Sequence, residues 1–192
     1  MKAVCIGGCP GWLYFGIFMK FRNRDHEILV VERNKADDTF GWGVVFSDQT
    51  MERLQANDTR SADWILDQFA HWDDIEVHYR NHVIRSGGHG FSGLGRQRLL
   101  HLLQKRALEL GVKIHFEHEI HNLDQFKDAD LIVACDGINS WIRDEHAEHF
   151  QPDIDVRTNR FVWLGTNKVF EAFTFIFEAT EHGWIWAHAY RF

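Results

Sequence analysis

The first 33 residues follow a strand, turn, helix, strand order. Residues 2–8 contain an apolar run after Lys2 and end in two glycines, and residues 10–24 have the composition of a helix. Residues 26–33 contain a second apolar run, 28–31, that ends in charge. Pro10 suits the first turn of a helix, because its fixed φ is helical and its missing N–H would be unpaired there anyway. Two strands joined by a crossover helix lie parallel in one sheet. This segment therefore predicts an α/β, Rossmann-like domain with a parallel sheet.

The turn after the first strand has features of a dinucleotide-binding turn, in which the N-terminus of a helix holds a pyrophosphate. Gly7 and Gly8 allow close approach of the backbone, and Glu32 ends the second strand near the spacing of about 20 residues expected of a ribose-binding acid. The motif alone is weak, because Cys9 and Trp12 stand where its second and third glycines belong. On this segment alone, an ordinary glycine-rich turn in an unrelated α/β protein is the alternative.

Further elements follow from hydrophobic periodicity along the chain. Leucines recur with helical spacing after residue 96, and Gly111 marks the end of that helix. We expect helices over 48–58, 61–72 and 96–111, a hairpin over 74–86 with residues 80 and 81 at its tip, and buried strands over 112–120 and 128–137.

From about residue 155 the sequence becomes aromatic and alternating. Residues 156–170, 172–179 and 183–192 each have the pattern of a strand, which predicts an antiparallel sheet. We therefore expect a dinucleotide-binding domain over 1–154, incomplete and carrying the inserted hairpin, and the beginning of a second, substrate-binding domain over 155–192. The pattern stops inside a strand at Phe192, which is typical of a fragment.

Composition narrows the class of protein. With 45% hydrophobic and 26% charged residues among 192, the chain should be globular. A net charge of -7 without a basic cluster argues against nucleic acid as a partner. The uncharged stretch 3–19 is broken by glycines and a proline, so we expect a buried strand and helix there and no membrane anchor. Three scattered cysteines make no disulfide framework, which favours a reducing, cytoplasmic location.

A second candidate site follows the buried strand near residue 130. Asp136 and Gly137 come directly after this strand, with Ser140 and Arg143 on the next helical turn. A carboxylate at the carboxyl end of a parallel strand can reach a ligand in the crevice there, and the glycine permits close backbone approach. An Asp-Gly turn is common, but the spacing of these four residues is less so.

Three motifs together resemble the flavoprotein aromatic hydroxylases, single-component FAD monooxygenases with the para-hydroxybenzoate hydroxylase fold. That family carries a Glu-Arg pair at the end of the second strand, an Arg followed by leucines three and seven positions later, and a strand that ends Asp-Gly-x-x-Ser-x-x-Arg. Residues 36–50 and 84–91 are similar to the members that act on aryl-CoA thioesters. The matching residues are Glu32 and Arg33, then Arg96, Leu99 and Leu103, then Asp136, Gly137, Ser140 and Arg143.

The resemblance implies FAD as cofactor, NAD(P)H and O2 as co-substrates, and a small aromatic substrate, with an aryl-CoA thioester as the expected class. It assigns no catalytic side chain, since the chemistry belongs mostly to the cofactor. The implied FAD contacts are Gly7, Gly8, Pro10 and Gly11 at the pyrophosphate, Glu32 at the ribose, Arg33 near the adenine, Trp42, Gly43 and Val44 beside the isoalloxazine, Arg96 near the phosphates, and Asp136 and Gly137 at their turn.

Two departures from the family lead us to expect weak or absent FAD binding. The side chain of Cys9 would crowd the pyrophosphate, and the indole of Trp12 would wedge between helix and sheet. Overpacking of this kind costs about 1–3 kcal/mol. The alternative to an enzyme is thus a truncated or altered Rossmann-like domain that keeps the fold without activity.

The 13 histidines raise the question of a metal site. They cluster within 115–121 and 146–149. In a strand, His115 and His121 share a face that His118 does not, and no set of four metal ligands emerges. We expect no metal and solvated surface residues. His89 lies in a glycine-rich loop and is the candidate for a substrate contact.

Overall fold

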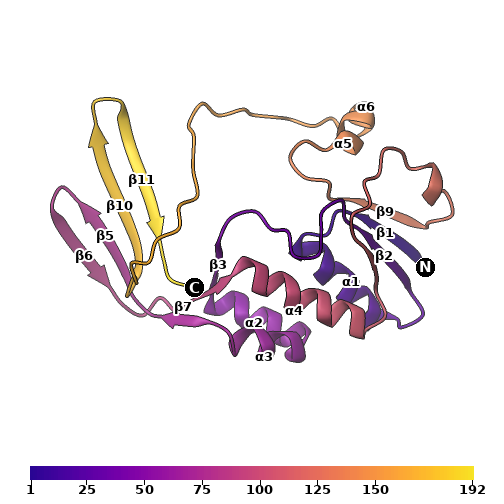
Figure 1. The fold of residues 1–192 in the computed structure, drawn as a ribbon, viewed down its shortest axis with the longest axis horizontal. Helices are drawn as coiled ribbons and strands as arrows, with labels where there is room; N and C mark the ends of the chain where they lie inside the picture. The colour runs from indigo at the N-terminus through magenta and orange to yellow at the C-terminus, as the bar shows by residue number, and fades with distance from the viewer. The chain divides into compact units, whose positions relative to one another are not determined.

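The computed structural model describes all residues from 1 to 192 and divides the chain into two compact units (Figure 1). The first unit contains residues 1–39 and 100–162, and the second contains residues 40–99 and 163–192. The expected domain boundary at residue 154 stays a prediction. A strand pairing, described below, joins the central hairpin to the C-terminal strands within the second unit.

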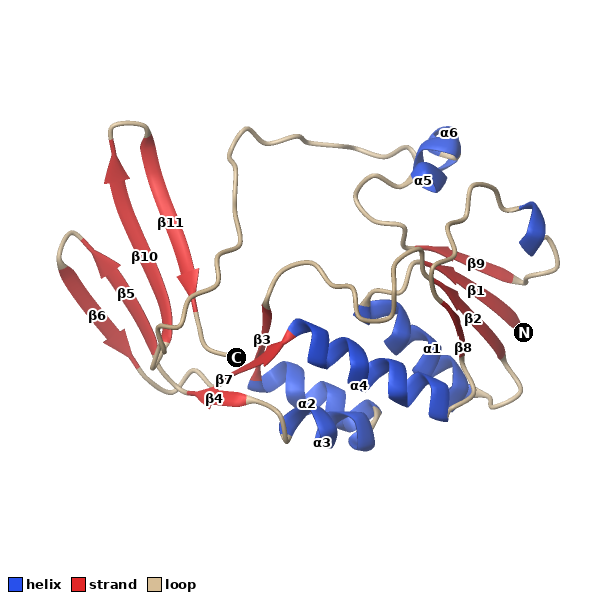
Figure 2. Ribbon diagram, viewed as in Figure 1, coloured by secondary structure: helices blue, strands red, loops and turns tan.

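The first unit is built on a parallel sheet (Figure 2). Its strands are β1 (Lys2–Ile6), β2 (Glu27–Val31), β8 (Lys113–His115) and β9 (Leu131–Ala134). They lie in the order β8-β2-β1-β9, and every neighbouring pair is parallel. Helix α1 (Pro10–Arg22) joins β1 to β2. The predicted Rossmann-like parallel sheet is therefore confirmed.

Helix α1 packs on this sheet through a narrow stripe of two large apolar residues and a glycine. Leu13, Gly16 and Ile17 are its buried residues. A Cβ at Gly16 would lie 3.4 Å from side-chain atoms of Ile28 and Val112, so the bare glycine sets how closely helix and sheet approach. A separate apolar cluster contains Val4, Ile6, Val31, Ile120, Phe126 and Ile142.

Short helices complete the first unit. The 3-10 turn η1 (Asp124–Phe126) precedes β9, and α5 (Trp141–Glu145) and α6 (Ala147–Phe150) follow it. Helix α4 (Arg96–Glu109) begins in the second unit's segment and continues into the first, close to its predicted bounds. None of the helices is both long and apolar enough to cross a bilayer.

The second unit contains a small antiparallel sheet with two helices. Strands β3 (Gly43–Ser47), β7 (Phe91–Gly95) and β4 (Ala70–Trp72) lie in that order. Helices α2 (Asp48–Asn57) and α3 (Thr59–Leu66) follow β3 in the chain. The expected helix over 61–72 is wrong at its end, because residues 70–72 pair with β7 as a strand.

A second sheet of this unit has the order β11-β10-β5-β6. The hairpin of β5 (Ile75–Tyr79) and β6 (His82–Ser86) is confirmed, with Arg80 and Asn81 at φ 46° and 64°, as a tight primed turn requires. β10 (Phe173–Thr180) and β11 (Gly183–Ala189) form an antiparallel pair.

The expected antiparallel pairing of the C-terminal strands is confirmed, and the register of this sheet adds one pairing and corrects one expectation. β10 pairs with β5 in parallel, so the sheet is mixed and includes the hairpin. The expected strand over 156–170 is absent, since residues 151–172 contain no strand. β10 has the distant β5 and the following β11 as its two neighbours, and the segment before it does not join the sheet.

Candidate nucleotide-binding site

The turn between β1 and α1 requires glycine at its first position. Gly7 has a φ of +112°, and its N–H donates to the Val31 carbonyl oxygen at 2.7 Å. A Cβ at Gly7 would lie 2.3 Å from the carbonyl oxygen of Cys135, well inside van der Waals contact. The backbone of the turn therefore passes directly against the chain that leaves β9.

The N-terminus of α1 is open, although the carboxylate of Glu32 lies against the N–H of the adjacent Gly8. Cys9 is the N-cap, its side chain is exposed, and its thiol makes no capping hydrogen bond. The first turn contains no acidic residue, and a Cβ at Gly11 would meet no atom within 4 Å. Because the helix dipole and unpaired N–H groups favour anions, this end can accept a phosphate.

The carboxylate of Glu32 already accepts three hydrogen bonds. Its Oε2 accepts from the Gly8 N–H at 2.6 Å, and its Oε1 accepts from the backbone N–H and side-chain amide of Asn34 at 2.8 and 2.7 Å. A carboxylate has about four acceptor positions, so one remains for a ribose hydroxyl. Sequence reasoning missed Asn34, although an amide two residues after an acid is a recognisable signal.

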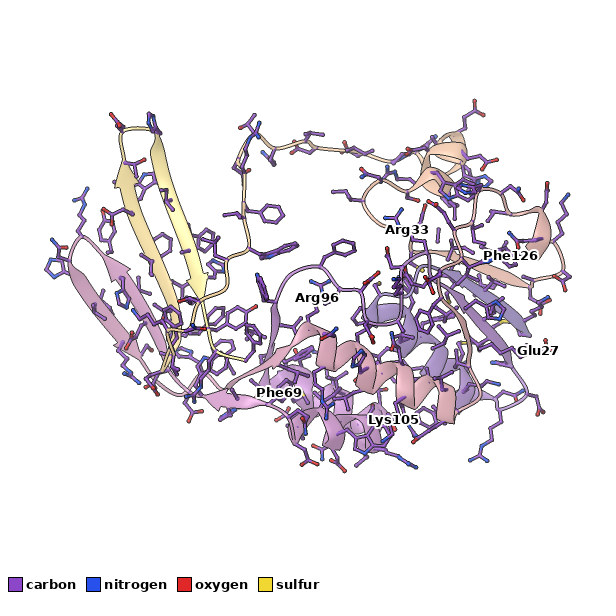
Figure 3. All side chains as sticks on the ribbon, viewed as in Figure 1. Glu27, Arg33, Phe69, Arg96, Lys105 and Phe126 are labelled. Atoms are coloured by element: carbon purple, nitrogen blue, oxygen red, sulfur yellow. The ribbon has the colours of Figure 1, made fainter.

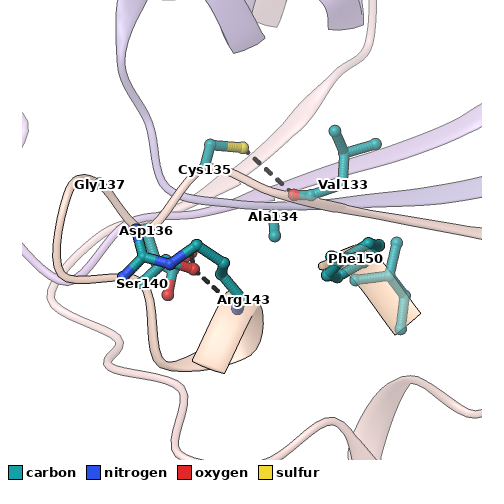
Figure 4. Close-up of a pocket in the computed structure, with 9 residues that line it drawn as sticks. Val133, Ala134, Cys135, Asp136, Gly137, Ser140, Arg143 and Phe150 are labelled. Atoms are coloured by element: carbon teal, nitrogen blue, oxygen red, sulfur yellow. Dashed lines mark hydrogen bonds between the residues drawn. The ribbon is translucent and has the colours of Figure 1, made fainter. Parts of the chain in front are cut away.

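The turn after β9 contains an unpaired carboxylate oxygen (Figure 4). Asp136 Oδ1 accepts from the Ser140 hydroxyl at 2.6 Å, while Oδ2 is buried and has no partner. Gly137 has a φ of +96°. The turn borders a cavity of about 410 Å³ that Arg143 and Phe150 also line. Because a buried acceptor without a donor is costly, a hydroxyl or amide of a ligand is the expected partner.

These groups meet at one edge of the sheet. β1 lies between β2 and β9, and all three are parallel, so the loops after them emerge together. Gly7, Glu32 and Asp136 follow these three strands in turn. The carboxyl edge of such a sheet is where nucleotides bind in open α/β folds. The side chain of Arg33, the next residue after Glu32, is exposed (Figure 3).

The hydrogen-bonding groups at this edge of the sheet fit FAD. A phosphate needs the anion-accepting end of α1, and sugar hydroxyls need acceptors such as the spare position on Glu32 and the unpaired oxygen of Asp136. The Gly8 N–H, by contrast, is already committed to Glu32.

The other predicted site residues lie in the second unit. Trp42 is exposed, and its carbonyl oxygen accepts from the N–H of Arg96 at 2.8 Å. Gly43 and Val44 begin β3, opposite Gly95 and Leu94 of β7. His89 is also exposed, and its Nε2 shares a hydrogen bond of 2.8 Å with the Ser86 hydroxyl. No three His, Cys, Asp or Glu side chains in the structure are placed to hold a metal ion.

Trp12 does not separate helix from sheet, so that expectation is wrong. The indole is half-buried and contacts Phe15 edge-on, with ring centroids 6.3 Å apart. The buried residues of the helix are Leu13, Gly16 and Ile17 instead, and Trp12 lies one turn before Gly16, at the margin of that buried face.

The three thiols differ in accessibility, which predicts their reactivity. Burial raises the pKa of Cys5 to about 12, with a smaller contribution from the nearby Cys9, and burial likewise raises the pKa of Cys135. Because the thiolate is the reactive form, we expect iodoacetamide at pH 8 to label Cys9 alone in the native protein. Peptide mass spectrometry checks this, and Cys9→Ser should abolish the fast labelling. Equally rapid labelling of Cys5 or Cys135 would contradict it.

Comparison with curated proteins finds similarity along the whole chain. No family model matches the sequence. Salicyloyl-CoA 5-hydroxylase of a Streptomyces species is 42% identical over 190 residues, which cover 99% of this chain and 37% of that protein. Protodeoxyviolaceinate monooxygenase of Chromobacterium violaceum is 29% identical, covering 100% of this chain and 52% of the relative. The chain thus spans between about a third and about half of the relatives' length.

Solved structures share the fold. The tetrameric form of 2-methyl-3-hydroxypyridine-5-carboxylic acid oxygenase matches with a TM-score of 0.63 and 24% identity, covering 74% of this chain and 41% of that one. Pseudomonas aeruginosa PqsL, solved with 2-aminobenzoylacetate, matches with a TM-score of 0.62 and 12% identity over 83% of this chain and 48% of the other.

Proposed function

We propose that this chain, which belongs to the flavin-dependent aromatic hydroxylases and is homologous to their N-terminal part, binds FAD at the carboxyl edge of the parallel sheet. The observation that carries the proposal is the convergence of the α1 N-terminus, Glu32 and the unpaired oxygen of Asp136 after three adjacent strands. The family uses FAD and NAD(P)H.

Each residue has a proposed role that its geometry permits. Gly7 keeps the turn against β9 and so positions the N-terminus of α1, which holds the pyrophosphate with Pro10 and Gly11. Glu32 accepts from the ribose with its remaining acceptor position, and Asp136 and Gly137 contact the flavin nucleotide. Bound FAD supplies the redox chemistry that transfers one oxygen atom of O2 to an aromatic ring.

The substrate class is proposed from one relative. The Streptomyces protein is a salicyloyl-CoA hydroxylase, and an electron-rich aryl-CoA thioester is therefore the proposed substrate of the protein to which this chain corresponds. NAD(P)H as reductant, His89 as a substrate contact and a cytoplasmic location belong to the same proposal.

A catalytically silent domain is the second candidate, and Cys9 favours it. This side chain stands at the N-cap of α1, where the family has glycine and where a pyrophosphate would approach. A sulfur atom there crowds the ligand, so we expect FAD affinity well below that of a flavoprotein that retains its cofactor through purification.

Protection of Cys9 from alkylation tests the proposed site. We expect FAD and ADP, which both carry the pyrophosphate, to slow labelling of Cys9 by iodoacetamide, whereas riboflavin, which lacks it, should not. The measurement is the labelling rate against ligand concentration. Absence of protection at millimolar FAD would favour the silent domain, while stoichiometric FAD in the purified protein would contradict the expected low affinity.

A further inference from the structure

The Glu32 side chain lies directly against the glycine turn between β1 and α1. Its Oε2 accepts from the Gly8 N–H at 2.6 Å, and a Cβ at Gly8 would lie 3.0 to 3.2 Å from three side-chain atoms of Glu32. Helix α1 begins two residues later, at Pro10. A negative charge therefore stands at the border of the proposed pyrophosphate site.

Asn34 holds the other oxygen of this carboxylate. Oε1 of Glu32 accepts from the backbone N–H of Asn34 at 2.8 Å and from its side-chain amide at 2.7 Å. Together with the Gly8 N–H, these donors engage both carboxylate oxygens. All three donors belong to neutral amide groups, so they fix the position of the carboxylate without cancelling its charge.

The backbone that carries Glu32 and Asn34 is also fixed. The Glu32 N–H donates to the His115 carbonyl oxygen at 2.8 Å, and the Glu32 carbonyl oxygen accepts from the His118 N–H at 3.0 Å. The Asn34 carbonyl oxygen accepts from the Glu117 N–H at 3.1 Å. A ligand that is repelled by the carboxylate can therefore displace it only by breaking several hydrogen bonds.

The basic side chains nearby do not make this segment a phosphate site. Residues 32–38 contain three acidic and two basic side chains. The basic ones, Arg33 and Lys35, are exposed, whereas Glu32 is half-buried. Water and salt screen exposed charges more strongly than partly buried ones. A phosphate placed beside Glu32 therefore meets net repulsion.

We propose that Gly8 and Asn34 position the Glu32 carboxylate so that this site accepts an ADP moiety only when its ribose is unphosphorylated. The inference rests on the proposed function, in which Glu32 accepts from the ribose of FAD. A ribose hydroxyl donates to the carboxylate, whereas a phosphate dianion has no proton to donate and is repelled. The site thus excludes NADPH and CoA thioesters, which carry a 2′-phosphate and a 3′-phosphate, and neither competes with FAD.

Two ligand pairs that differ by one phosphate test this selectivity on the whole chain. NADP+ is NAD+ with a 2′-phosphate, and S-benzyl-CoA is S-benzyl-dephospho-CoA with a 3′-phosphate, the benzyl group blocking the thiol. The measurement is the ligand concentration that halves the rate of Cys9 labelling by iodoacetamide. We expect the phosphorylated member of each pair to require a concentration about ten-fold higher or more.

Three variants separate positioning of this carboxylate from a general effect of charge. Glu32→Gln removes the repulsion, so the members of each pair should protect within about three-fold of each other. Asn34→Ala removes one of the fixing donors and should weaken NAD+ more than NADP+, which narrows the ratio. Asp38→Asn makes the same charge change in the same segment, keeps an oxygen for the Lys35 N–H, and should leave the ratio as in the parent.

The ratio within a pair reports selectivity, because a merely structural loss weakens both members equally. Equal protection by both members in the parent overturns this inference and leaves the proposed function standing. A ratio that is unchanged in Glu32→Gln, or lowered as much by Asp38→Asn, also overturns it. Absence of protection by FAD, ADP and NAD+ alike marks failure of the proposed function, and this inference falls with it.

Discussion

Replacing Gly7 by alanine is expected to lower the free energy of unfolding by about 3 kcal/mol and to abolish FAD binding. The added Cβ would lie 2.3 Å from the Cys135 carbonyl oxygen, an atom of the backbone that cannot move aside as a side chain can. The φ of +112° at this position adds strain for any residue with a Cβ. The turn must then move away from β9, and the N-terminus of α1 moves with it. Urea denaturation followed by circular dichroism measures the loss of stability.

Gly11→Ala is the matched control for this change. It lies four residues later in the same turn and helix start, and its added Cβ would meet no atom within 4 Å. Alanine has a higher helix propensity than glycine, so we expect unchanged or slightly raised stability. Equal destabilisation by both substitutions would show that the contact with Cys135 is not the cause.

The Cys9→Gly substitution is expected to raise FAD affinity about ten-fold or more. Removing the side chain relieves overpacking worth about 1–3 kcal/mol at the position where the pyrophosphate approaches. The thiol is exposed and makes no capping hydrogen bond, so its loss should cost the fold little. Quenching of FAD fluorescence on titration gives the two dissociation constants.

Trp12→Gly separates the effect of Cys9 from that of its neighbour. Since Trp12 is half-buried and the helix packs through Leu13, Gly16 and Ile17, removing the indole should change FAD affinity little. Glycine within the helix should lower stability by about 1 kcal/mol. An affinity gain in Trp12→Gly that matches or exceeds the gain in Cys9→Gly would overturn this account of the turn.

Sequence reasoning worked best where local chemistry decides the structure. The strand, turn, helix, strand unit, the hairpin with Arg80 and Asn81 at its tip, and the helix after residue 96 all formed close to their predicted bounds. Periodicity and turn residues are local signals, and they act on the same few residues whose conformation they predict.

Alternation failed for residues 156–170 because it identifies a strand without identifying a neighbour. These residues have the pattern of a strand, yet residues 151–172 contain none. β10 reaches back to pair with β5, nearly 100 residues earlier, and with β11 on its other side. This pairing also places the hairpin and the C-terminal strands in one unit, although they are far apart in the chain.

The sequence by itself determined most of the elements, the parallel sheet and the residue types that meet at its carboxyl edge, because these depend on spacing along the chain. Only the tertiary structure decided that Glu32 accepts a hydrogen bond from Gly8 and that Trp12 contacts Phe15. The same holds for the contact of the Trp163 ring with Gly41. Each of these depends on which atoms of distant segments come within a few ångströms. No periodicity within either segment encodes such an approach, since it follows from packing two segments against each other.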